Sequence, residues 1–374
     1  MKALVLAGGR GTRLRPITHT SAKQLVPVAN KPVLFYGLES IRAAGITEVG
    51  IVVSDPREML TPDPRTGQAT TVMVNSQAEI RAAVGDGSAF GLEVTYIEQE
   101  APLGLAHAVK IAQPYIRDEP FVMYLGDNLI KDGITPFVRE FMAEKPNAQI
   151  LLAQVKTPSD YGVAELEGER VVRLEEKPAH PKSDLALVGV YLFDKTVFEA
   201  VNAITPSRRG ELEITDAIQH LINAGRTVRS HVIGGWWKDT GRVEDLLEAN
   251  RMMLAPIKTE ILGQVDDATE IEGAVRIGAG TVVEHARLRG PLVIGAGARI
   301  VHAYVGPFTA LGDGVELDHA EIEHSIMLER SRILNLPHRV ESSLIGRDVV
   351  VCGKDTRPRA HRLMLGDSSR VELS

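Results

Sequence analysis

The residues best suited to chemistry lie near the start of the chain, in a run rich in glycine and arginine. Glycines leave backbone N–H groups open to an anion, and arginine guanidinium groups bind phosphate oxygens. The run therefore predicts a loop that holds phosphate groups. It consists of Gly8, Gly9, Arg10, Gly11, Thr12 and Arg13, and it follows the apolar run Lys2–Leu6, which predicts a buried parallel strand.

Two common glycine motifs do not fit this loop. The dinucleotide-binding motif requires a third glycine where Leu14 stands. The P-loop requires Lys and then Ser or Thr directly after its last glycine, but Gly11 is followed by Thr12. A glycine turn whose basic residues merely face solvent is the alternative, and the additional basic residue Lys23 favours phosphate binding over it.

Two aspartates elsewhere in the chain are candidate metal ligands. Asp127 follows a predicted buried strand at 121–125, and Asp239 directly follows Trp236, Trp237 and one lysine. An aspartate at the carboxyl end of a strand is well placed to hold a metal ion, although it often caps the next helix instead. Carboxylate oxygens are ligands that Mg²⁺ prefers. If the fold brings the two carboxylates together, we expect a Mg²⁺ site.

Two further clusters carry polar groups suited to a base and a sugar. Gln99 precedes a loop that contains Pro102 and Gly104, and its amide offers a donor and an acceptor to a base edge. Glu176 can accept hydrogen bonds from sugar hydroxyls, and Lys177 can hold a phosphate. Taken alone, a surface glutamine and a solvated charge cluster are the simpler interpretations.

Composition limits the class of protein. The 374 residues suffice for two domains, and the net charge of -7 argues against general nucleic-acid binding while permitting a nucleotide. Cys352 is the only cysteine, so no disulfide can form within the chain and we expect a reducing, cytoplasmic location. The chain opens on a predicted strand without an export signal, and no apolar run approaches the roughly 18 residues of a membrane helix.

Residues 1–250 alternate predicted strands and helices. A helix at 33–46 precedes a strand at 49–53, and a helix at 245–254 ends this part of the chain. This order favours an α/β fold with a mixed, mainly parallel, Rossmann-like sheet and crossover helices. Residues 55–70 are rich in proline and are expected to form a loop, which is either a lid, an interface or tolerated surface.

Beyond about residue 271 an aliphatic residue recurs every six positions, with glycine and alanine between. This period is typical of a hexapeptide β-helix, in which stacked coils bury an inner aliphatic column. We expect a linker at 251–270 and a β-helix at 271–374. The aliphatic positions are Ile271, Ile277, Val283, Ile294, Ile300, Val305, Leu311 and Leu317.

Taken together, the motifs of residues 1–250 resemble those of the glucose-1-phosphate thymidylyltransferases, and the β-helix is similar to that of the longer members. The motifs are 8–13 with Lys23, Gln99 with 104–105, 125–128, 161–163, 175–178, 209–216 and 239–241. The resemblance implies the nucleotidyltransferase fold followed by a short left-handed parallel β-helix. It also implies transfer of a nucleotidyl group from dTTP to glucose 1-phosphate, which gives dTDP-glucose and pyrophosphate, with Mg²⁺ as cofactor in a homo-oligomer.

The resemblance assigns roles to individual residues. The catalytic residues would be Arg13, Lys23, Asp127, Lys177 and Asp239, with Mg²⁺ held by Asp127 and Asp239. The nucleotide would be bound by Leu6, Gly8, Gly9, Gly11, Thr12, Arg13, Gln99, Pro102, Gly104 and Asp127. The sugar phosphate would be bound by Tyr161, Gly162, Glu176, Lys177 and Val188.

One departure from the short members leaves the base open. Many of those have Asp where this chain has Leu103, and that residue touches the nucleoside. A uridylyl-, adenylyl- or guanylyltransferase is therefore an alternative. A catalytically silent regulatory protein with the same two-domain layout is another, but the joint presence of Arg13, Lys23, Asp127, Lys177 and Asp239 speaks against it. A second, acyl-transferring activity is another alternative, although histidines in coil turns are expected to be surface residues. The histidines concerned are His285, His302, His319 and His324.

Overall fold

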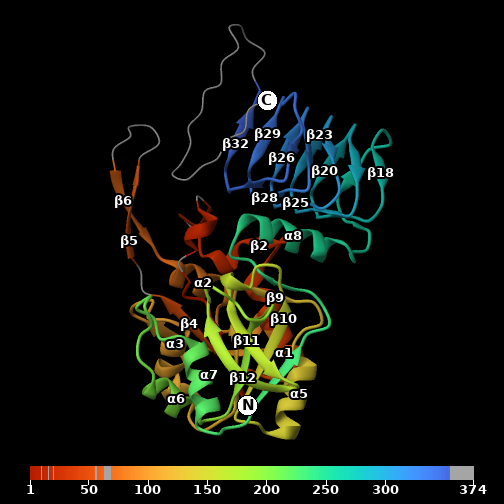
Figure 1. The fold of residues 1–374 in the computed structure, drawn as a ribbon. Coiled ribbons are helices and arrows are strands. Elements are labelled where there is room, and N and C mark those ends of the chain that lie inside the picture. The colour runs from red at the N-terminus through yellow and green to blue at the C-terminus, as the bar shows by residue number, and fades with distance from the viewer. Residues whose placement is uncertain (10, 16, 20, 55–56, 63–68, 354–374) are drawn as a thin grey trace.

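An α/β part and a β-helix follow one another in the computed structural model, and helix α8 (Val243–Leu254) lies between them (Figure 1). The structure describes residues 1–9, 11–15, 17–19, 21–54, 57–62 and 69–353. Over these ranges no helix combines the length and the apolar character that crossing a membrane requires.

The α/β part is built on a nine-stranded mixed sheet. Its central strands run parallel: β1 (Lys2–Leu6) lies between β4 (Glu48–Ser54) and β8 (Phe121–Leu125), and β7 (Glu93–Gln99) continues beyond β4. The remaining strands are β13 (Leu185–Phe193), β11 (Gly162–Glu167), β12 (Arg170–Glu176), β10 (Ala148–Gln154) and β14 (Val228–Val232). The predicted mixed, mainly parallel α/β sheet is confirmed.

Helices bury the apolar groups of the sheet on both of its faces. Side chains alternate along β1, so Leu4 and Leu6 enter one apolar cluster while Ala3 and Val5 enter the other. The helix predicted at 33–46 is α1 (Val33–Ala43). The other helices of this part are α2 (Ser76–Val84), α3 (Leu105–Ile111), α4 (Gln113–Ile116), α5 (Thr135–Glu144), α6 (Val197–Ala203) and α7 (Ile214–Asn223).

The prediction of a loop at 55–70 is wrong for the residues of this span that the structure describes. Strands β5 (Arg57–Pro62) and β6 (Ala69–Val74) form an antiparallel hairpin that extends from the carboxyl end of β4, away from the main sheet (Figure 1). Residues 55–56 and 63–68 lie outside the described residues. The β-branched residues of β6 favour a strand, and Pro62 stands at the end of β5, where a missing N–H donor is tolerated.

Three parallel sheets form the β-helix, so this prediction is also confirmed. The first contains β16 (Glu260–Ile261), β19 (Val275–Ile277), β22 (Leu292–Ile294), β25 (Thr309–Leu311), β28 (Ile326–Met327) and β31 (Leu344–Ile345). The second contains β17 (Gln264–Val265), β20 (Val282–Glu284), β23 (Arg299–Val301), β26 (Glu316–Asp318), β29 (Arg332–Leu334) and β32 (Val350–Cys352). The third contains β18 (Glu270–Glu272), β21 (Arg287–Arg289), β24 (Tyr304–Val305), β27 (Glu321–Glu323) and β30 (Val340–Glu341).

The expected inner column is buried with one exception. Positions 277, 283, 294, 300, 305, 311 and 317 are at most 1% exposed. Ile271 is 37% exposed, because β18 is the first strand of its sheet and no coil covers it. Strands β16 and β17 of the β-helix lie within 251–270, which was expected to be a linker. The last part of the predicted β-helix, 354–374, lies outside the described residues.

Histidines occupy exposed turns of successive coils. His285, His302 and His319 have φ of 50°, 47° and 48°, and their ring centroids lie 5.0 Å and 4.6 Å apart along the stack. These three are exposed, as expected of coil turns, whereas His324, the fourth histidine of the prediction, is half-buried.

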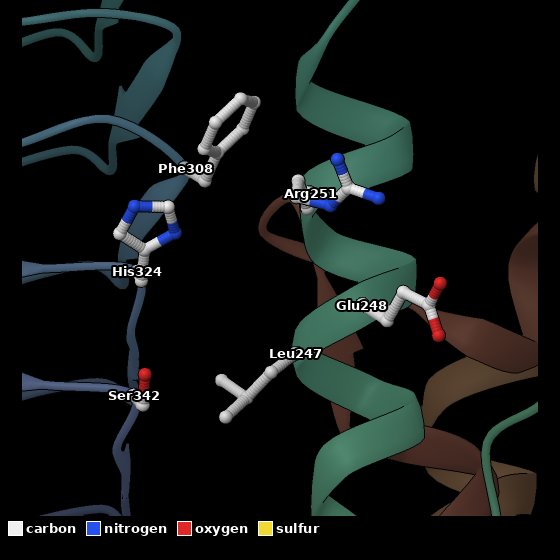
Figure 2. A pocket seen from close by; sticks show the side chains of 6 residues that line it. All are labelled: Leu247, Glu248, Arg251, Phe308, His324 and Ser342. Carbon is white, nitrogen blue, oxygen red and sulfur yellow. The ribbon is translucent and has the colours of Figure 1, made fainter.

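The two parts share an interface along α8. Asn250 is fully buried: its Nδ2 donates to the Phe308 carbonyl at 2.8 Å, and its Oδ1 accepts from the Ala29 N–H at 2.8 Å. Asn30 Nδ2 donates to the Leu311 carbonyl at 2.6 Å. A cavity of about 280 Å³ opens beside these contacts (Figure 2), between Leu247, Glu248 and Arg251 of α8 and the β-helix residues Phe308, His324 and Ser342. The interface therefore joins the β-helix to the segment that follows the glycine-rich loop.

Candidate active site

The predicted site residues converge on one edge of the sheet, because the carboxyl ends of parallel strands meet there. Gly8 follows β1, Gln99 ends β7, and Asp127 follows β8. Ser54, at the end of β4, pairs in register with Gln99, and its hydroxyl donates a hydrogen bond to the Gly8 carbonyl. The strand order thus places residues that lie over a hundred positions apart beside one loop.

The glycines of this loop make room for Lys23. A Cβ at Gly9 would lie 2.5 Å from the Lys23 Cε, so any larger residue there would displace the lysine. Gly11 has φ of +61° and leads into the short helix Thr12–Leu14. The Gly11 carbonyl accepts a hydrogen bond of 2.6 Å from the Thr18 hydroxyl. The loop is therefore shaped around the lysine side chain.

The structure places the basic residues of the loop unequally. Arg13 is exposed. Its positive charge acts to lower the pKa of Lys23, against the stronger effect of the two carboxylates, so Arg13 lies close to Lys23. Arg10 and the side chain of Thr12 lie outside the described residues. Leu6 is 8% exposed and belongs to the apolar core beneath the loop.

Asp127 and Asp239 lie on neighbouring chain segments. The short strands β9 (Asn128–Ile130) and β15 (Trp237–Asp239) pair antiparallel, with Asp239 opposite Asn128. The backbone N–H and hydroxyl of Thr240 both donate to the Asp127 carbonyl, at 3.0 Å and 2.8 Å. Lys23 forms an ion pair with Asp127. One ammonium and two carboxylates thus share a largely buried space.

Electrostatics in this cluster are unbalanced. Burial and the negative charge of Asp127 raise the pKa of Asp239 to about 6, against the opposing effect of Lys23. Burial alone would raise the pKa of Asp127, but the Lys23 ammonium and hydrogen bonds outweigh it and lower that pKa. Burial lowers the pKa of Lys23, yet the two carboxylates raise it overall. With one positive and two negative groups, the cluster favours an additional cation.

Asn128 holds the acid pair in place, and sequence reasoning gave it no role. Its Nδ2 donates to Asp127 Oδ1 at 3.0 Å. Its Oδ1 accepts from the Gly189 N–H at 3.2 Å and from Trp237 Nε1 at 2.5 Å. Its backbone carbonyl accepts from the Tyr124 hydroxyl at 3.0 Å. The only sequence signal was its position beside Asp127 in the motif 125–128.

These two carboxylates are the candidate metal ligands. Across the described ranges, no group of three or more His, Cys, Asp or Glu side chains gathers as a metal cage. Two carboxylates suit Mg²⁺, which keeps several waters and takes further oxygens from substrate phosphates. The Lys23 ammonium already neutralises one negative charge, so the remaining charge is what a cation would compensate.

Gln99 and its neighbours form the candidate site for the base. Gln99 is 8% exposed, and its Nε2 donates to the Gly104 carbonyl at 3.3 Å and lies 3.0 Å from His107 Nδ1. Burial and Lys110 lower the pKa of His107, so the neutral ring can accept this hydrogen bond. Sequence reasoning missed His107. Pro102 is exposed in the loop that follows β7. Gly104 packs so closely that a Cβ there would lie 2.4 Å from the Leu212 carbonyl oxygen.

The predicted sugar-phosphate residues form a second cluster. Gly162 pairs with Glu176 across β11 and β12, and the Lys177 N–H donates to the Tyr161 carbonyl at 3.0 Å. The ring of Tyr161 packs edge-on against Trp237 at 5.3 Å, two residues before Asp239. The aromatic pair thus links the second cluster to the acid pair.

Glu176 has partners that the sequence analysis did not assign. Its carboxylate lies 3.5 Å from the Arg209 guanidinium, 3.4 Å from the Thr215 hydroxyl and 3.9 Å from the Lys177 ammonium. Burial and the nearby Glu213 raise the pKa of Glu176, against the effect of Lys177 and Arg209. The motif 209–216 was recognised, but no residue in it was given a role.

Val188 does not join this cluster through its side chain. It is fully buried within the apolar core on one face of the sheet. Its neighbour Gly189 instead contacts Asn128 through the backbone.

The chain belongs to the nucleotidyl transferase family, whose family model matches residues 2–255. A glucose-1-phosphate thymidylyltransferase of Streptomyces antibioticus is 56% identical over 100% of this chain and 99% of its own length. A low-salt glycan biosynthesis nucleotidyltransferase of Haloferax volcanii is 42% identical over the full length of both chains. The resemblance to glucose-1-phosphate thymidylyltransferases that the motifs indicated is therefore confirmed along the whole chain.

A solved structure agrees with this assignment. A Bacillus anthracis protein assigned as a glucose-1-phosphate thymidylyltransferase superimposes with a TM-score of 0.59 at 32% identity. The match covers 70% of this chain and 97% of that one.

We expect Gly189→Ala to disturb the acid pair. A Cβ at Gly189 would lie 2.5 Å from Asn128 Oδ1, so the asparagine must move and lose its bonds to Trp237 and Asp127. The predicted result is a lower melting temperature and altered tryptophan emission. Gly234→Ala is the control, because nothing lies within 4 Å of a Cβ there. Equal melting temperatures and spectra for the two variants would contradict the packing described here.

Proposed function

We propose that this protein transfers the thymidylyl group of dTTP to glucose 1-phosphate, giving dTDP-glucose and pyrophosphate. The observation that carries the proposal is the acid pair, Asp127 and Asp239, sharing Lys23 beside the glycine-rich loop. The full-length similarity to thymidylyltransferases of two Streptomyces species supports the choice of base and sugar.

The chemistry requires little beyond positioning and charge neutralisation. A phosphate oxygen of glucose 1-phosphate is already anionic at neutral pH, so no general base is needed. This oxygen attacks the α-phosphorus of dTTP in line, the bond from the α-phosphorus to the bridging oxygen breaks, and pyrophosphate leaves. The protein lowers the barrier by holding both substrates and by stabilising negative charge on the transferring group.

Each cluster then has a role. Arg13 and Lys23, with the backbone N–H groups of the loop, hold the triphosphate; Lys177 holds the incoming phosphate, and Glu176 accepts from sugar hydroxyls. The thymine would contact Gln99 and Gly104, with the remaining residues forming the walls of the two pockets. These residues are Leu6, Gly8, Gly9, Gly11, Thr12 and Pro102 for the nucleotide, and Tyr161 and Gly162 for the sugar. Val188 would contribute only its backbone to the sugar pocket, because its side chain is buried in the apolar core.

Mg²⁺ is the proposed cofactor, held by Asp127 and Asp239. When bound, it would supply positive charge to the phosphate oxygens. The excess negative charge of the acid pair and its oxygen-only donor set support this assignment.

We also propose a cytoplasmic homo-oligomer with two domains. The single cysteine supports the location. Apolar side chains exposed at both ends of the β-helix support self-association, since large exposed apolar groups often mark contact surfaces. They are Ile261, Leu262, Val349 and Val350. We place the domain boundary between α8 and β16, rather than at residue 271.

Substrate identity is tested by measuring pyrophosphate release from dTTP, UTP, ATP and GTP, each with glucose 1-phosphate and with other sugar phosphates. We expect the pair of dTTP and glucose 1-phosphate to give the highest kcat/KM, and EDTA to abolish the rate until Mg²⁺ is restored. A higher kcat/KM with another triphosphate would identify a different nucleotidyltransferase. No release from any pair would favour a silent regulatory protein.

Lys177→Ala separates the two substrates. We expect the KM for glucose 1-phosphate to rise about tenfold or more, the effect of losing one charge-assisted hydrogen bond, while the KM for dTTP changes by less than about twofold. Lys195→Ala is the matched control, because Lys195 is an exposed lysine paired with Asp118 at 3.7 Å. A larger change in the KM for dTTP would remove Lys177 from the sugar-phosphate site.

A further inference from the structure

The last coils of the β-helix reach the loop that carries Lys23 through one arginine. Arg347 Nη1 donates to the Ser21 hydroxyl oxygen at 2.6 Å, across 326 positions of sequence. Its Nε donates to the Glu329 carboxylate on the preceding coil at 2.7 Å. Glu329 therefore orients the guanidinium, and the guanidinium in turn contacts the loop.

Apolar packing supports this contact. A Cβ at Gly346 would lie 3.2 Å from Ile17 Cδ1, so the coil and the loop touch directly beside Arg347. Leu14 is fully buried in an apolar cluster that also contains Ile326 of the β-helix. Apolar packing thus accompanies the polar contact on the same surface, although the Arg347 side chain itself is exposed.

The loop is also held from the α/β part. The Ala22 N–H donates to Glu79 Oε2, on α2, at 2.8 Å. Ser21 and Ala22 are only 8% and 3% exposed, and Lys23 follows them directly. The two residues before Lys23 are therefore held by different parts of the protein, Ser21 by the β-helix and Ala22 by α2.

We propose that Arg347 is a positioning residue for nucleotidyl transfer. By holding Ser21, it fixes the backbone that leads into Lys23 and so keeps the ammonium aligned with Asp127. The kinetic consequence rests on the function proposed above, whereas the contact itself does not. Because Lys23 serves the triphosphate, losing this contact acts on the nucleotide rather than on the sugar phosphate. Through Arg347, the β-helix then helps to position a site that lies outside it.

The kinetic test compares Arg347→Ala with Arg330→Ala. Arg330 is a matched control, because it is an exposed arginine of the adjacent coil that bonds Asp348 at 2.7 Å and 2.8 Å. We expect Arg347→Ala to raise the KM for dTTP about tenfold while the KM for glucose 1-phosphate stays within about twofold of the native value. Arg347→Lys retains one donor and should restore part of the loss. Arg330→Ala should leave both KM values unchanged.

Hydrogen exchange gives a readout that does not depend on activity. The amides of Leu25 and Val26 donate to the Ala22 and Lys23 carbonyls, at 3.0 Å and 3.2 Å, and report on this loop. We expect Arg347→Ala to speed their exchange while β-helix amides keep their native rates. Ser21→Ala removes the acceptor without altering the β-helix and should give the same pattern, even if Arg347→Ala folds poorly.

The outcomes distinguish the two proposals. A native protein that releases no pyrophosphate from any substrate pair overturns the proposed function, and loop exchange then still decides whether Arg347 holds the loop. Native activity with unchanged kinetics in both Arg347→Ala and Ser21→Ala overturns the positioning role, whatever their exchange rates. Equal rises in both KM values would indicate a general structural effect and would also overturn it.

Discussion

Two carboxylates that share one ammonium are the constraint on which the rest of the site depends. Asp127 and Asp239 lie on paired segments, and Lys23 compensates only one of their charges. Like charges in a buried space are costly unless a cation joins them, so the arrangement is suited to a divalent ion that arrives with a polyphosphate. The proposed Mg²⁺ would compensate the negative charge that Lys23 leaves unbalanced.

The fold maintains this arrangement through several independent contacts. Thr240 joins the two acidic segments by hydrogen bonds to the Asp127 carbonyl, and Asn128 donates a hydrogen bond to the Asp127 carboxylate. Gly9 leaves the space that the Lys23 side chain occupies. The three contacts come from three different segments of the chain. The β-helix adds a further contact, because Arg347 binds Ser21, which lies two residues before Lys23.

Much of the architecture could be predicted from local patterns. The apolar run at Lys2–Leu6 and the six-residue period from Ile277 onward each reflect burial, which the sequence records directly. The hairpin at β5 and β6 was missed because its prolines indicated a loop while its β-branched residues favoured strands. Ile271 has the same residue type as the inner column, and only its place at the end of a sheet exposes it.

The site was less predictable than the fold. Motif residues such as Asp127 carry their chemistry in their type, but their supports do not. His107, Arg209 and Asn128 act through partners that lie between 8 and 109 positions away in the sequence. These contacts exist only once the strands are in register. Arg347 is further still, and an arginine in a coil turn gives no local sign that it contacts a loop of the α/β part.

The most direct test of the acid pair is the turnover of Asp239→Asn, measured as pyrophosphate release, together with its melting temperature. Asparagine keeps the shape of the side chain but removes one of the two negative charges. The account predicts a fall in kcat of about a hundredfold or more, since charge stabilisation is lost, with no fall in melting temperature because repulsion from Asp127 is relieved. The exposed Asp267→Asn should match the native protein in both measurements. Near-native turnover in Asp239→Asn would contradict the account.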